Sequence, residues 1–207
     1  MNSKIVHLVD DDEAIRHSAS FMLRHAGYTV KTYKDGIAFL DAVTAEMEGC
    51  ILLDVRMPGM DGLAVQAMLK QRGIKMPVII LTGHGDVPVA VEAMKGGAVE
   101  FLEKPYEKAA LVRSIQNAFE QLENQSVSDL RSVEAQSKLT KLTPREREVL
   151  ECLVDGLTNK AIADVLSISP RTIEIHRSNM MEKLEAESLS AALRIAFLAG
   201  IGMKDDG

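Results

Sequence analysis

The sequence predicts an α/β fold, a doubly wound five-stranded parallel sheet, followed by a second, smaller all-α domain. In residues 1–105, short apolar runs alternate with segments of helical period, which is the pattern of a sheet covered by helices on both faces. From residue 141 onward only helical periods occur. The chain has 207 residues, 46% hydrophobic and 26% charged, so each of two domains has enough residues to bury its own core.

Five segments are predicted strands. The runs Ile5–Val9, Cys50–Leu53 and Val78–Leu81 are short, apolar and non-alternating, as expected of parallel strands that helices cover on both faces. Thr29–Tyr33 and Val99–Leu102 are weaker candidates for two more. Five strands that alternate with helices therefore define the expected sheet.

Helices are predicted between these strands because apolar residues recur there at helical spacing. Such stripes occupy residues 15–26, 63–73 and 87–96, and a further helix is expected over residues 107–125. Gly27 follows the first stripe and is a typical helix stop. We interpret the stripes as faces that pack on the core.

Two domains, residues 1–123 and 141–207, are predicted to be joined by residues 124–140. The joining segment is rich in Ser, Gln, Asp and Glu and contains no Pro or Gly, which predicts a partly helical linker. Thr143-Pro144-Arg145-Glu146 then provides a capping Thr, a Pro in the first turn and a Glu at the third position. Three or four short helices follow, separated by breaks at Gly156, residues 167–170 and Ser188.

Composition limits the location and the partners of the protein. The N-terminal apolar run is too short for a signal peptide and is followed at once by three Asp residues, and no run approaches the about 20 apolar residues of a membrane span. We therefore expect a cytoplasmic protein without membrane contact. The two Cys residues lie far apart, which favours free buried thiols over a disulfide or a metal site.

Polar residues follow four of the predicted strands. Asp10 and Asp11 come after the first strand, Asp54 ends the third, Thr82 ends the fourth and Lys104 follows the fifth. Ligands of parallel α/β sheets bind beyond the carboxyl ends of the strands, so these side chains should meet at one edge. Each Asp alone is explained equally well as a helix cap or turn residue. The whole set favours a functional site.

The chemistry of this set suits formation of an aspartyl phosphate. Crowded carboxylates attract a hard divalent cation, and Mg²⁺ shares its oxygen shell readily with phosphate. Asp54 is the expected nucleophile, while Mg²⁺ and Lys104 neutralise charge on the transferring oxygens. The Thr82 hydroxyl would gain a phosphoryl oxygen as acceptor only after transfer. This new hydrogen bond would act as a switch.

A small phosphatase of the haloacid dehalogenase type is the enzyme alternative. Such an enzyme needs a second Asp two residues after the nucleophile, where this chain has Arg56. We therefore predict a phosphoryl acceptor that has slow self-dephosphorylation at most, and not an enzyme.

The C-terminal domain contains the pattern of a helix-turn-helix. A short helix over residues 161–166 is followed by a brief turn and by a second helix that begins at Pro170 or Arg171. The second helix of this motif enters the DNA major groove. The residues expected to reach phosphates are Lys160, Arg171, Thr172, His176 and Arg177. Those expected at base edges are Glu174, Ile175 and Ser178, with Ser169 at the start of the helix.

Charge gives little support to DNA binding. Residues 158–184 contain four Lys/Arg and three Asp/Glu, and the whole chain has a net charge of −6. A single domain would bind DNA weakly, whereas a dimer doubles the contacts. Two interpretations therefore stay open from charge: a DNA-binding domain, and a module that binds only proteins. Glu174 is likewise suited to a cytosine amino group and to a salt bridge with a neighbouring Arg.

Several motifs resemble known families. Four motifs resemble the receiver domain of bacterial two-component response regulators, which has a flavodoxin-like fold, and the resemblance is strongest to the FixJ subgroup. These motifs are Val9–Asp11, Leu53–Gly62, Leu81–Gly85 and Glu103–Tyr106. The LuxR/NarL-type DNA-binding domain is resembled by Leu142–Leu150, Asn159–Ala163 and Ser169–Arg177. The two resemblances cover essentially the whole chain.

The resemblance implies a mechanism. Asp54 accepts phosphate from a sensor histidine kinase, and Mg²⁺ is held by Asp11, Asp54 and the Arg56 backbone carbonyl, with help from Asp10. Thr82 and Tyr106 form a switch pair, and phosphorylation drives a homodimer that binds promoter DNA and acts on RNA polymerase. The last helix, over residues 189–199, is a dimerising scaffold. Before phosphorylation, the DNA-binding domain is inhibited either because the receiver masks it or because the protein is monomeric, and the sequence does not distinguish these two mechanisms.

Arg56 and His84 lie two residues beyond Asp54 and Thr82. By the same resemblance they flank the phosphoryl group. We hypothesise that their bulk and positive charge obstruct the hydrolytic water and prolong the lifetime of the phosphorylated form.

Overall fold

The structure is a computed structural model that describes residues 4–83, 87–123 and 128–202. Backbone contacts group the chain into two compact units. The first comprises residues 1–84 and 96–125, and the second comprises residues 85–95 and 126–207.

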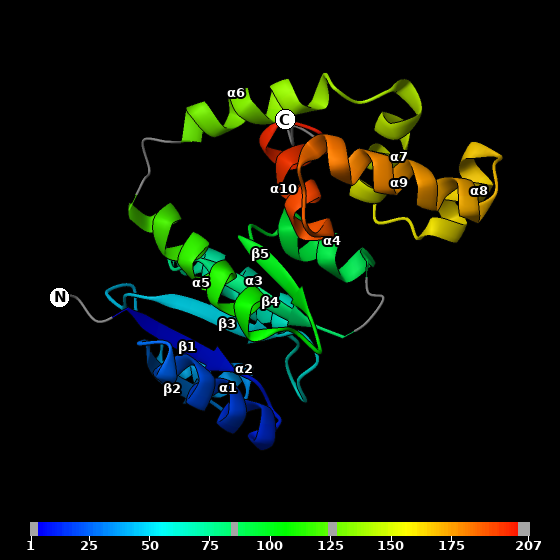
Figure 1. Cartoon of the computed structure of the whole chain (residues 1–207). Coiled ribbons are helices and arrows are strands. Elements are labelled where there is room, and N and C mark those ends of the chain that lie inside the picture. The colour runs from blue at the N-terminus through cyan, green and yellow to red at the C-terminus, as the bar shows by residue number, and fades with distance from the viewer. Residues whose placement is uncertain (1–3, 84–86, 124–127, 203–207) are drawn as a thin grey trace. The chain divides into compact units, whose positions relative to one another are not determined.

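The first unit contains a five-stranded, all-parallel sheet in the order β2-β1-β3-β4-β5 (Figure 1). Its strands are β1 (Ile5–Val9), β2 (Thr29–Tyr33), β3 (Cys50–Asp54), β4 (Val78–Thr82) and β5 (Glu100–Glu103). Every residue of β3 and β4 is buried. Central strands covered on both faces need apolar side chains in both directions, which explains the non-alternating runs. The predicted fold class is confirmed.

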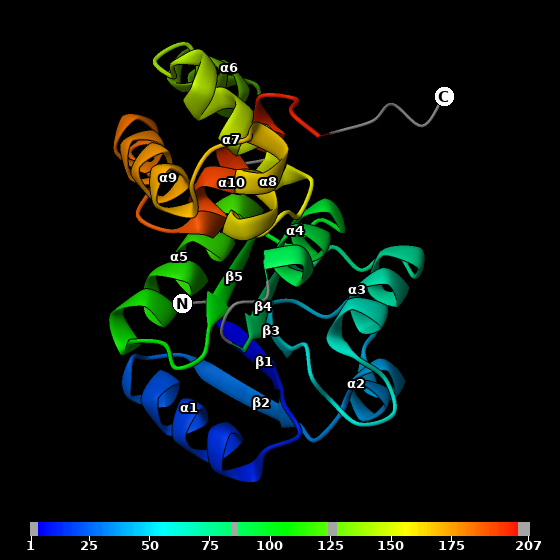
Figure 2. The ribbon, with the colours of Figure 1, turned by 90° about the vertical axis from the view of Figure 1, so that its right-hand side faces the viewer.

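Helices cover both faces of this sheet. Figure 2 shows α1 (Glu13–His25) and α5 (Lys108–Glu123) on one side, with α2 (Gly36–Ala42) and α3 (Gly62–Gln71) on the other. Helix α4 (Val87–Lys95) follows β4 in the sequence and is grouped with the second unit by its contacts. The predicted alternation of strands and helices is confirmed.

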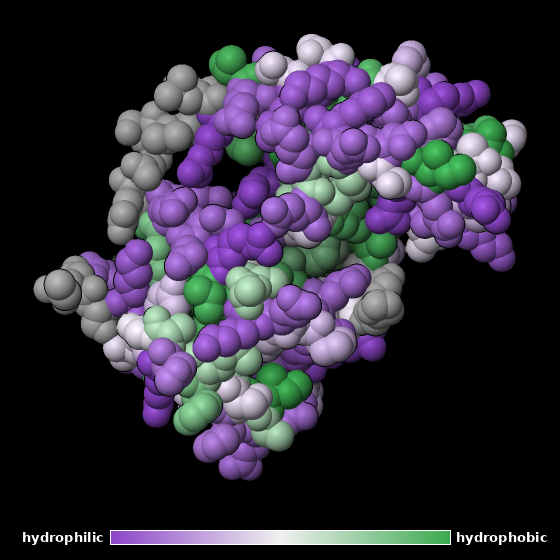
Figure 3. All heavy atoms as spheres, in the orientation of Figure 1, coloured by the Kyte–Doolittle hydropathy of each residue, from purple (hydrophilic) through white to green (hydrophobic). Residues whose placement is uncertain are grey.

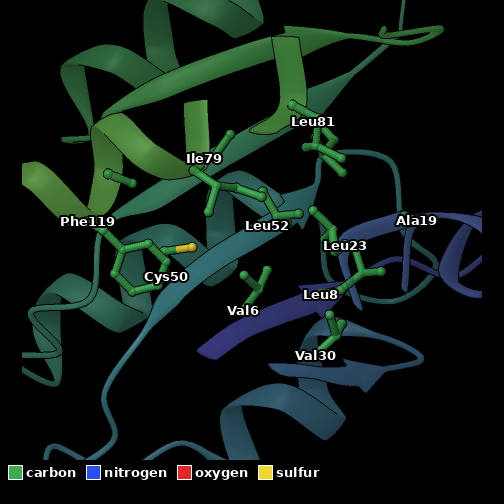
Figure 4. Close-up of a cluster of buried hydrophobic side chains, with 13 residues drawn as sticks. Val6, Leu8, Ala19, Leu23, Val30, Cys50, Leu52, Ile79, Leu81 and Phe119 are labelled. Carbon is green, nitrogen blue, oxygen red and sulfur yellow. The ribbon is translucent and has the colours of Figure 1, made fainter. Parts of the chain in front are cut away.

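The core of the first unit lies between the sheet and helices α1 and α5 (Figure 4). Leu8, Leu52 and Leu81 from three neighbouring strands are fully buried there, against Leu23 of α1. Burial of one such side chain contributes about 1.5–3 kcal/mol. This packed core fixes the positions of the strand ends relative to one another, and therefore also the positions of the polar residues at those ends.

The second unit is helical. Beyond α4 its helices are α6 (Ser128–Leu139), α7 (Pro144–Val154), α8 (Asn159–Leu166), α9 (Pro170–Leu184) and α10 (Leu189–Leu198). The predicted start of α7 is confirmed, since Thr143 and Glu146 form a reciprocal capping box. Leu150, Ile162 and Ile173 of α7, α8 and α9 are fully buried and form part of a shared core.

The segment predicted as a partly helical linker contains α6, and backbone contacts group residues 126–140 with the second unit. Helix α6 packs on α10 and, more weakly, on α9. The domain boundaries expected from the sequence stay a prediction.

Other expectations are met in part. Cys50 and Cys152 are free thiols; Cys50 is buried, whereas Cys152 is partly exposed. Among the described residues, no helix has the length and apolar character needed to cross a membrane. Figure 3 shows hydrophilic residues over most of the visible surface.

Candidate acidic pocket and nucleic-acid interface

The acidic pocket lies beyond the carboxyl ends of β1 and β3. Asp10, Asp11 and Asp54 each offer a carboxylate oxygen, and these oxygens lie within 4.8 Å of one another. Asp10 and Asp54 are buried, at 0% and 5% exposure, and Asp11 is exposed. The structure therefore brings together the three carboxylates that the sequence placed at strand ends.

Lys104 joins two of these carboxylates. Its Nζ donates to Asp10 Oδ2 at 2.7 Å and to Asp54 Oδ1 at 2.6 Å. The residue follows β5, and its backbone N–H donates to the carbonyl of Thr82 at 2.7 Å, which keeps it next to β4. A positive charge thus sits directly on the predicted nucleophile. The contact between Lys104 and Asp10 was not predicted from the sequence.

The run Asp10–Asp12 divides its work between capping and the pocket. Asp12 accepts from the backbone N–H groups of Ala14 and Ile15 and so caps α1. Asp10 Oδ1 accepts from the backbone N–H of Asp12 at 2.9 Å, and Arg16 Nη1 donates to the Asp10 carbonyl at 2.7 Å. The capping interpretation therefore holds for Asp12, and Asp10 points into the pocket.

Burial and neighbouring charges change the acid–base properties of the pocket. Burial, the largest cause, raises the pKa of Asp54; Lys104 opposes this rise, and Asp10 and Asp11 add to it. Burial also acts to lower the pKa of Lys104, but its hydrogen bonds to Asp10 and Asp54 outweigh burial and the pKa is raised. The lysine therefore stays charged at neutral pH.

Gly62 allows α3 to approach the predicted nucleophile closely. A Cβ atom on Gly62 would lie 2.3 Å from the carbonyl oxygen of Asp54, closer than any real contact allows. The Gly62 N–H also donates to the carbonyl of Val55 at 2.9 Å. Gly62 ends one of the motifs that resemble the receiver domain, but the sequence did not predict a role for it.

The other predicted pocket residues have different surroundings. Thr82 is 1% exposed, and its hydroxyl makes a long 3.5 Å contact with the Gly83 carbonyl. Tyr106 is partly buried against the core, and burial raises its pKa. Arg56 is exposed, and His84 lies outside the described residues.

Helices α8 and α9 form the predicted helix-turn-helix. Ser167 connects them in the left-handed conformation, with a φ of 55°, and Ile162, Ala163 and Ile173 are buried between them. A shallow depression on α9 is lined by Arg171, Glu174, Ile175 and Ser178. Ile175 in this depression is 54% exposed.

Some predicted DNA contacts are already engaged within the domain. Ser169 caps α9 by accepting from the Thr172 N–H at 3.1 Å, and the two hydroxyl oxygens lie 2.8 Å apart. Arg177 Nη1 donates to Asn159 Oδ1, which ties α9 to the start of α8. Lys160 is exposed, and His176 is partly exposed. Arg177 therefore holds the motif together, a role that the sequence pattern did not show.

Comparison with known families agrees with both halves of the chain. Residues 6–116 match the response regulator receiver domain, and residues 140–196 match the luxR family of bacterial regulatory proteins. The chain belongs to the response regulators that combine a receiver domain with a LuxR-type DNA-binding domain, and so to the transcriptional regulators of two-component systems.

Individual relatives are similar over nearly the whole chain. The transcriptional regulatory protein FixJ of Azorhizobium caulinodans is 47% identical, with 97% of this chain and 95% of the relative covered. FixJ of Rhizobium meliloti is 44% identical over 98% of this chain and 99% of the relative. The crystal structure of full-length FixJ from B. japonicum aligns with a TM-score of 0.58 and 46% identity, over 97% of this chain and 98% of that one.

Proposed function

We propose that Asp54 is the phosphoacceptor of this response regulator. The observation that carries the proposal is the pair of contacts from Lys104 Nζ to Asp54 and Asp10. An ammonium group held on the nucleophile can also contact a phosphoryl oxygen bound there. Charge neutralisation of this kind is the main task of a protein in phosphoryl transfer.

The expected donor is a phosphohistidine of a sensor histidine kinase. A carboxylate oxygen of Asp54 attacks phosphorus, the P–N bond to the imidazole breaks, and the departing imidazole takes up a proton. The product is an acyl phosphate on Asp54. Thr82 supports a switch after this step, because its buried hydroxyl makes a long 3.5 Å contact with the Gly83 carbonyl and would gain a stronger acceptor in the phosphoryl group.

Three carboxylates with oxygens within 4.8 Å of one another fit a hard divalent cation. Asp10, Asp11 and Asp54, with the Arg56 carbonyl, would hold Mg²⁺. The ion supplies positive charge that screens the anionic phosphoryl group. Lys104 alone leaves a net negative pocket, so we expect phosphorylation to require the metal.

Labelling with a small phosphodonor tests the pocket. The wild-type protein with acetyl phosphate and Mg²⁺ should gain one phosphoryl group by mass spectrometry, and Asp54→Asn should gain none. Asp41→Asn, an exposed Asp on α2, is the matched control and should label normally. Labelling of the Asp54→Asn variant at the wild-type rate would refute the assignment.

Arg56 and His84 are proposed to prolong the phosphorylated state by obstructing the hydrolytic water. Arg56 supports this in part, since its guanidinium carbon would lie 3.9 Å from a Cβ on Gly83, next to Thr82. Loss of phosphate from Arg56→Asn and His84→Ala should be faster than from wild type. Equal lifetimes would rule out the obstruction.

We further propose that α9 reads promoter DNA from a phosphorylation-dependent homodimer that acts on RNA polymerase. The exposed surface of Arg171, Glu174, Ile175 and Ser178 supports this, because it combines hydrogen-bonding groups with an apolar residue suited to a thymine methyl. Ser169 and Thr172 at the N-terminus of α9, with Lys160, would contact phosphates.

Footprinting with and without acetyl phosphate tests this second part. Phosphorylated protein should protect a two-fold symmetric site and sediment as a dimer, whereas the Asp54→Asn variant should do neither. The alternative, a receiver-controlled module that binds only proteins, predicts dimers without any protected DNA.

A further inference from the structure

Helix α6 lies before the region that matches the luxR family, which begins at residue 140. It nevertheless packs against α10 (Figure 1). Ala135 and Leu139 of α6 are buried, at 2% and 5% exposure. Ser132 Oγ donates to the carbonyl of Leu198 at 2.8 Å. Leu198 ends α10, so this bond satisfies one of the carbonyls that a helix leaves without an internal partner.

A second attachment joins α6 to the end of the predicted recognition helix. Lys138 Nζ lies 3.2 Å from Glu185 Oε2, and Lys141 Nζ lies 3.1 Å from Glu185 Oε1. The Lys138 side chain is 19% exposed and also lies 3.7 Å from Glu134, in the preceding turn of α6. Glu185 directly follows α9, so both of its oxygens connect this end of α9 to α6 and to the turn after it.

The backbone of Glu185 is in a conformation that is unusual for Glu. Its φ is 55°, in the left-handed region, where a helix usually ends with Gly. A Glu at this position is less favourable for the backbone than Gly. Hydrogen bonds with Lys141, which has the larger effect, and with Lys138 lower the pKa of Glu185 and keep its side chain anionic.

We propose that α6 is a positioning element of the DNA-binding domain, in which Lys138 and Lys141 hold Glu185 and thereby set the orientation of α9. This inference rests on the proposed DNA binding by α9. It places the N-terminal boundary of the functional domain at Ser128 instead of residue 141.

The sign of a charge change tests the proposal in the full-length, phosphorylated protein. The probe is a short duplex that the wild-type protein selects from a random pool. Glu185→Lys adds positive charge and would strengthen DNA binding by simple electrostatics. If Glu185 positions α9, affinity should instead fall about 3- to 10-fold, the scale of losing two partly exposed ion pairs. Glu182→Lys, the same charge change on an exposed residue of α9, is the control and should not weaken binding.

Two further variants separate positioning from stability. Glu185→Gly removes both ion pairs but relieves the left-handed backbone, so its unfolding temperature should not fall while its affinity falls as in Glu185→Lys. The charge-swapped triple variant Lys138→Glu, Lys141→Glu, Glu185→Lys re-forms both ion pairs but lowers the net charge by two, which weakens DNA binding by itself. It should therefore bind more tightly than Lys138→Glu, Lys141→Glu, Glu182→Lys, a control of the same net charge in which the pairs are not re-formed.

Wild-type affinity in both Glu185 variants, or a charge-swapped variant that binds no more tightly than its control of the same net charge, would overturn the role of α6 alone. A wild-type protein that selects no DNA would overturn the proposed function and this inference with it.

Discussion

Individual residues next to the acidic pocket of the first unit are needed for its geometry. Gly62 is one of them, because any side chain there would collide with the backbone of Asp54. Asp12 is another, since it caps α1 and leaves Asp10 for the pocket. In both cases the positions of the pocket carboxylates depend on the backbone around a neighbouring residue.

Gly62→Ala should therefore destabilise the first unit and impair phosphorylation. A Cβ that would lie 2.3 Å from a carbonyl oxygen forces the backbone to move, and such overpacking costs about 1–3 kcal/mol. Urea unfolding measures the loss. Gly83→Ala is the control, because among the described residues, its chain neighbours aside, the nearest heavy atom would lie 3.9 Å from the new Cβ, and its stability should be nearly unchanged. Equal stability of the two variants would contradict this account.

His7 gives the first unit a dependence on pH. It is 1% exposed, with its ring nitrogens 3.2 Å from Tyr33 Oη and 3.1 Å from the Glu48 carbonyl. Burial, the largest cause, lowers the pKa of His7, partly offset by the Glu48 carbonyl. The unfolded chain therefore binds a proton at a higher pH than the folded chain does.

It follows that stability is complete above the unfolded pKa of about 6.5 and is lost as pH falls toward the lower folded pKa. The loss should be about 1.4 kcal/mol for each pH unit between the two values. Urea unfolding of wild type and His7→Gln at pH 7.5 and 5.5 measures it. A variant that loses as much stability as wild type would show that His7 is not responsible.

At the level of elements, the orientation of helices in the second unit depends on buried polar contacts. Glu146, 3% exposed, accepts from the Thr143 backbone N–H at 2.8 Å and from Lys183 Nζ at 2.7 Å. One carboxylate thus starts α7 and holds it against the second half of α9. Arg177 and Asn159 similarly join α9 to α8.

Glu146→Gln should keep the helix cap and lose the charged contact with Lys183. We expect a loss of about 1.5–3 kcal/mol, the usual contribution of a hydrogen bond to a charged group. Glu148→Gln, which breaks only the exposed pair with Arg145, should lose at most about 0.5 kcal/mol. Urea unfolding followed by helical circular dichroism measures both changes, and similar losses would contradict the assigned role of Glu146.

The pH dependence of this contact follows from the same geometry. Burial acts to raise the pKa of Glu146, but Lys183 and Thr143 outweigh it and the pKa is lowered. The stabilisation is therefore present above the unfolded pKa and disappears as pH falls through the folded value.

For the whole molecule, DNA binding must overcome a net charge of −6. Positive side chains are few on the helix-turn-helix, and the proposed dimer would double the number of phosphate contacts. We therefore expect different variants to change affinity in different ways.

Lys160→Ala should weaken binding to all sequences and reduce the slope of log affinity against log salt by about 1 per subunit. Ile175→Ala should leave that slope unchanged and lower affinity about fivefold for the selected site only, or about 1 kcal/mol. Fluorescence anisotropy over a range of KCl concentrations distinguishes the two. Identical slopes for Lys160→Ala and wild type would remove Lys160 from the interface.

Much of this protein was predictable because its signals are local. Apolar runs and helical periods indicated the five strands and their helices, and strand-end positions indicated that Asp10, Asp54 and Lys104 meet at one edge. The helix-turn-helix followed from the short turn before Pro170. Each inference needs only sequence spacing and the rule that parallel strands end at the same edge.

Only the tertiary structure decided which side chains pair across long separations. Three such contacts join residues that are far apart in the chain. They pair Lys104 with Asp10, Glu146 with Lys183, and Lys138 with Glu185. Spacing does not encode such pairs, because the packing angles of helices and strands set which charged groups come within reach. The sequence alone therefore determined what kind of protein this is, and the fold decided that α6, within the predicted linker, contacts the residue that follows α9.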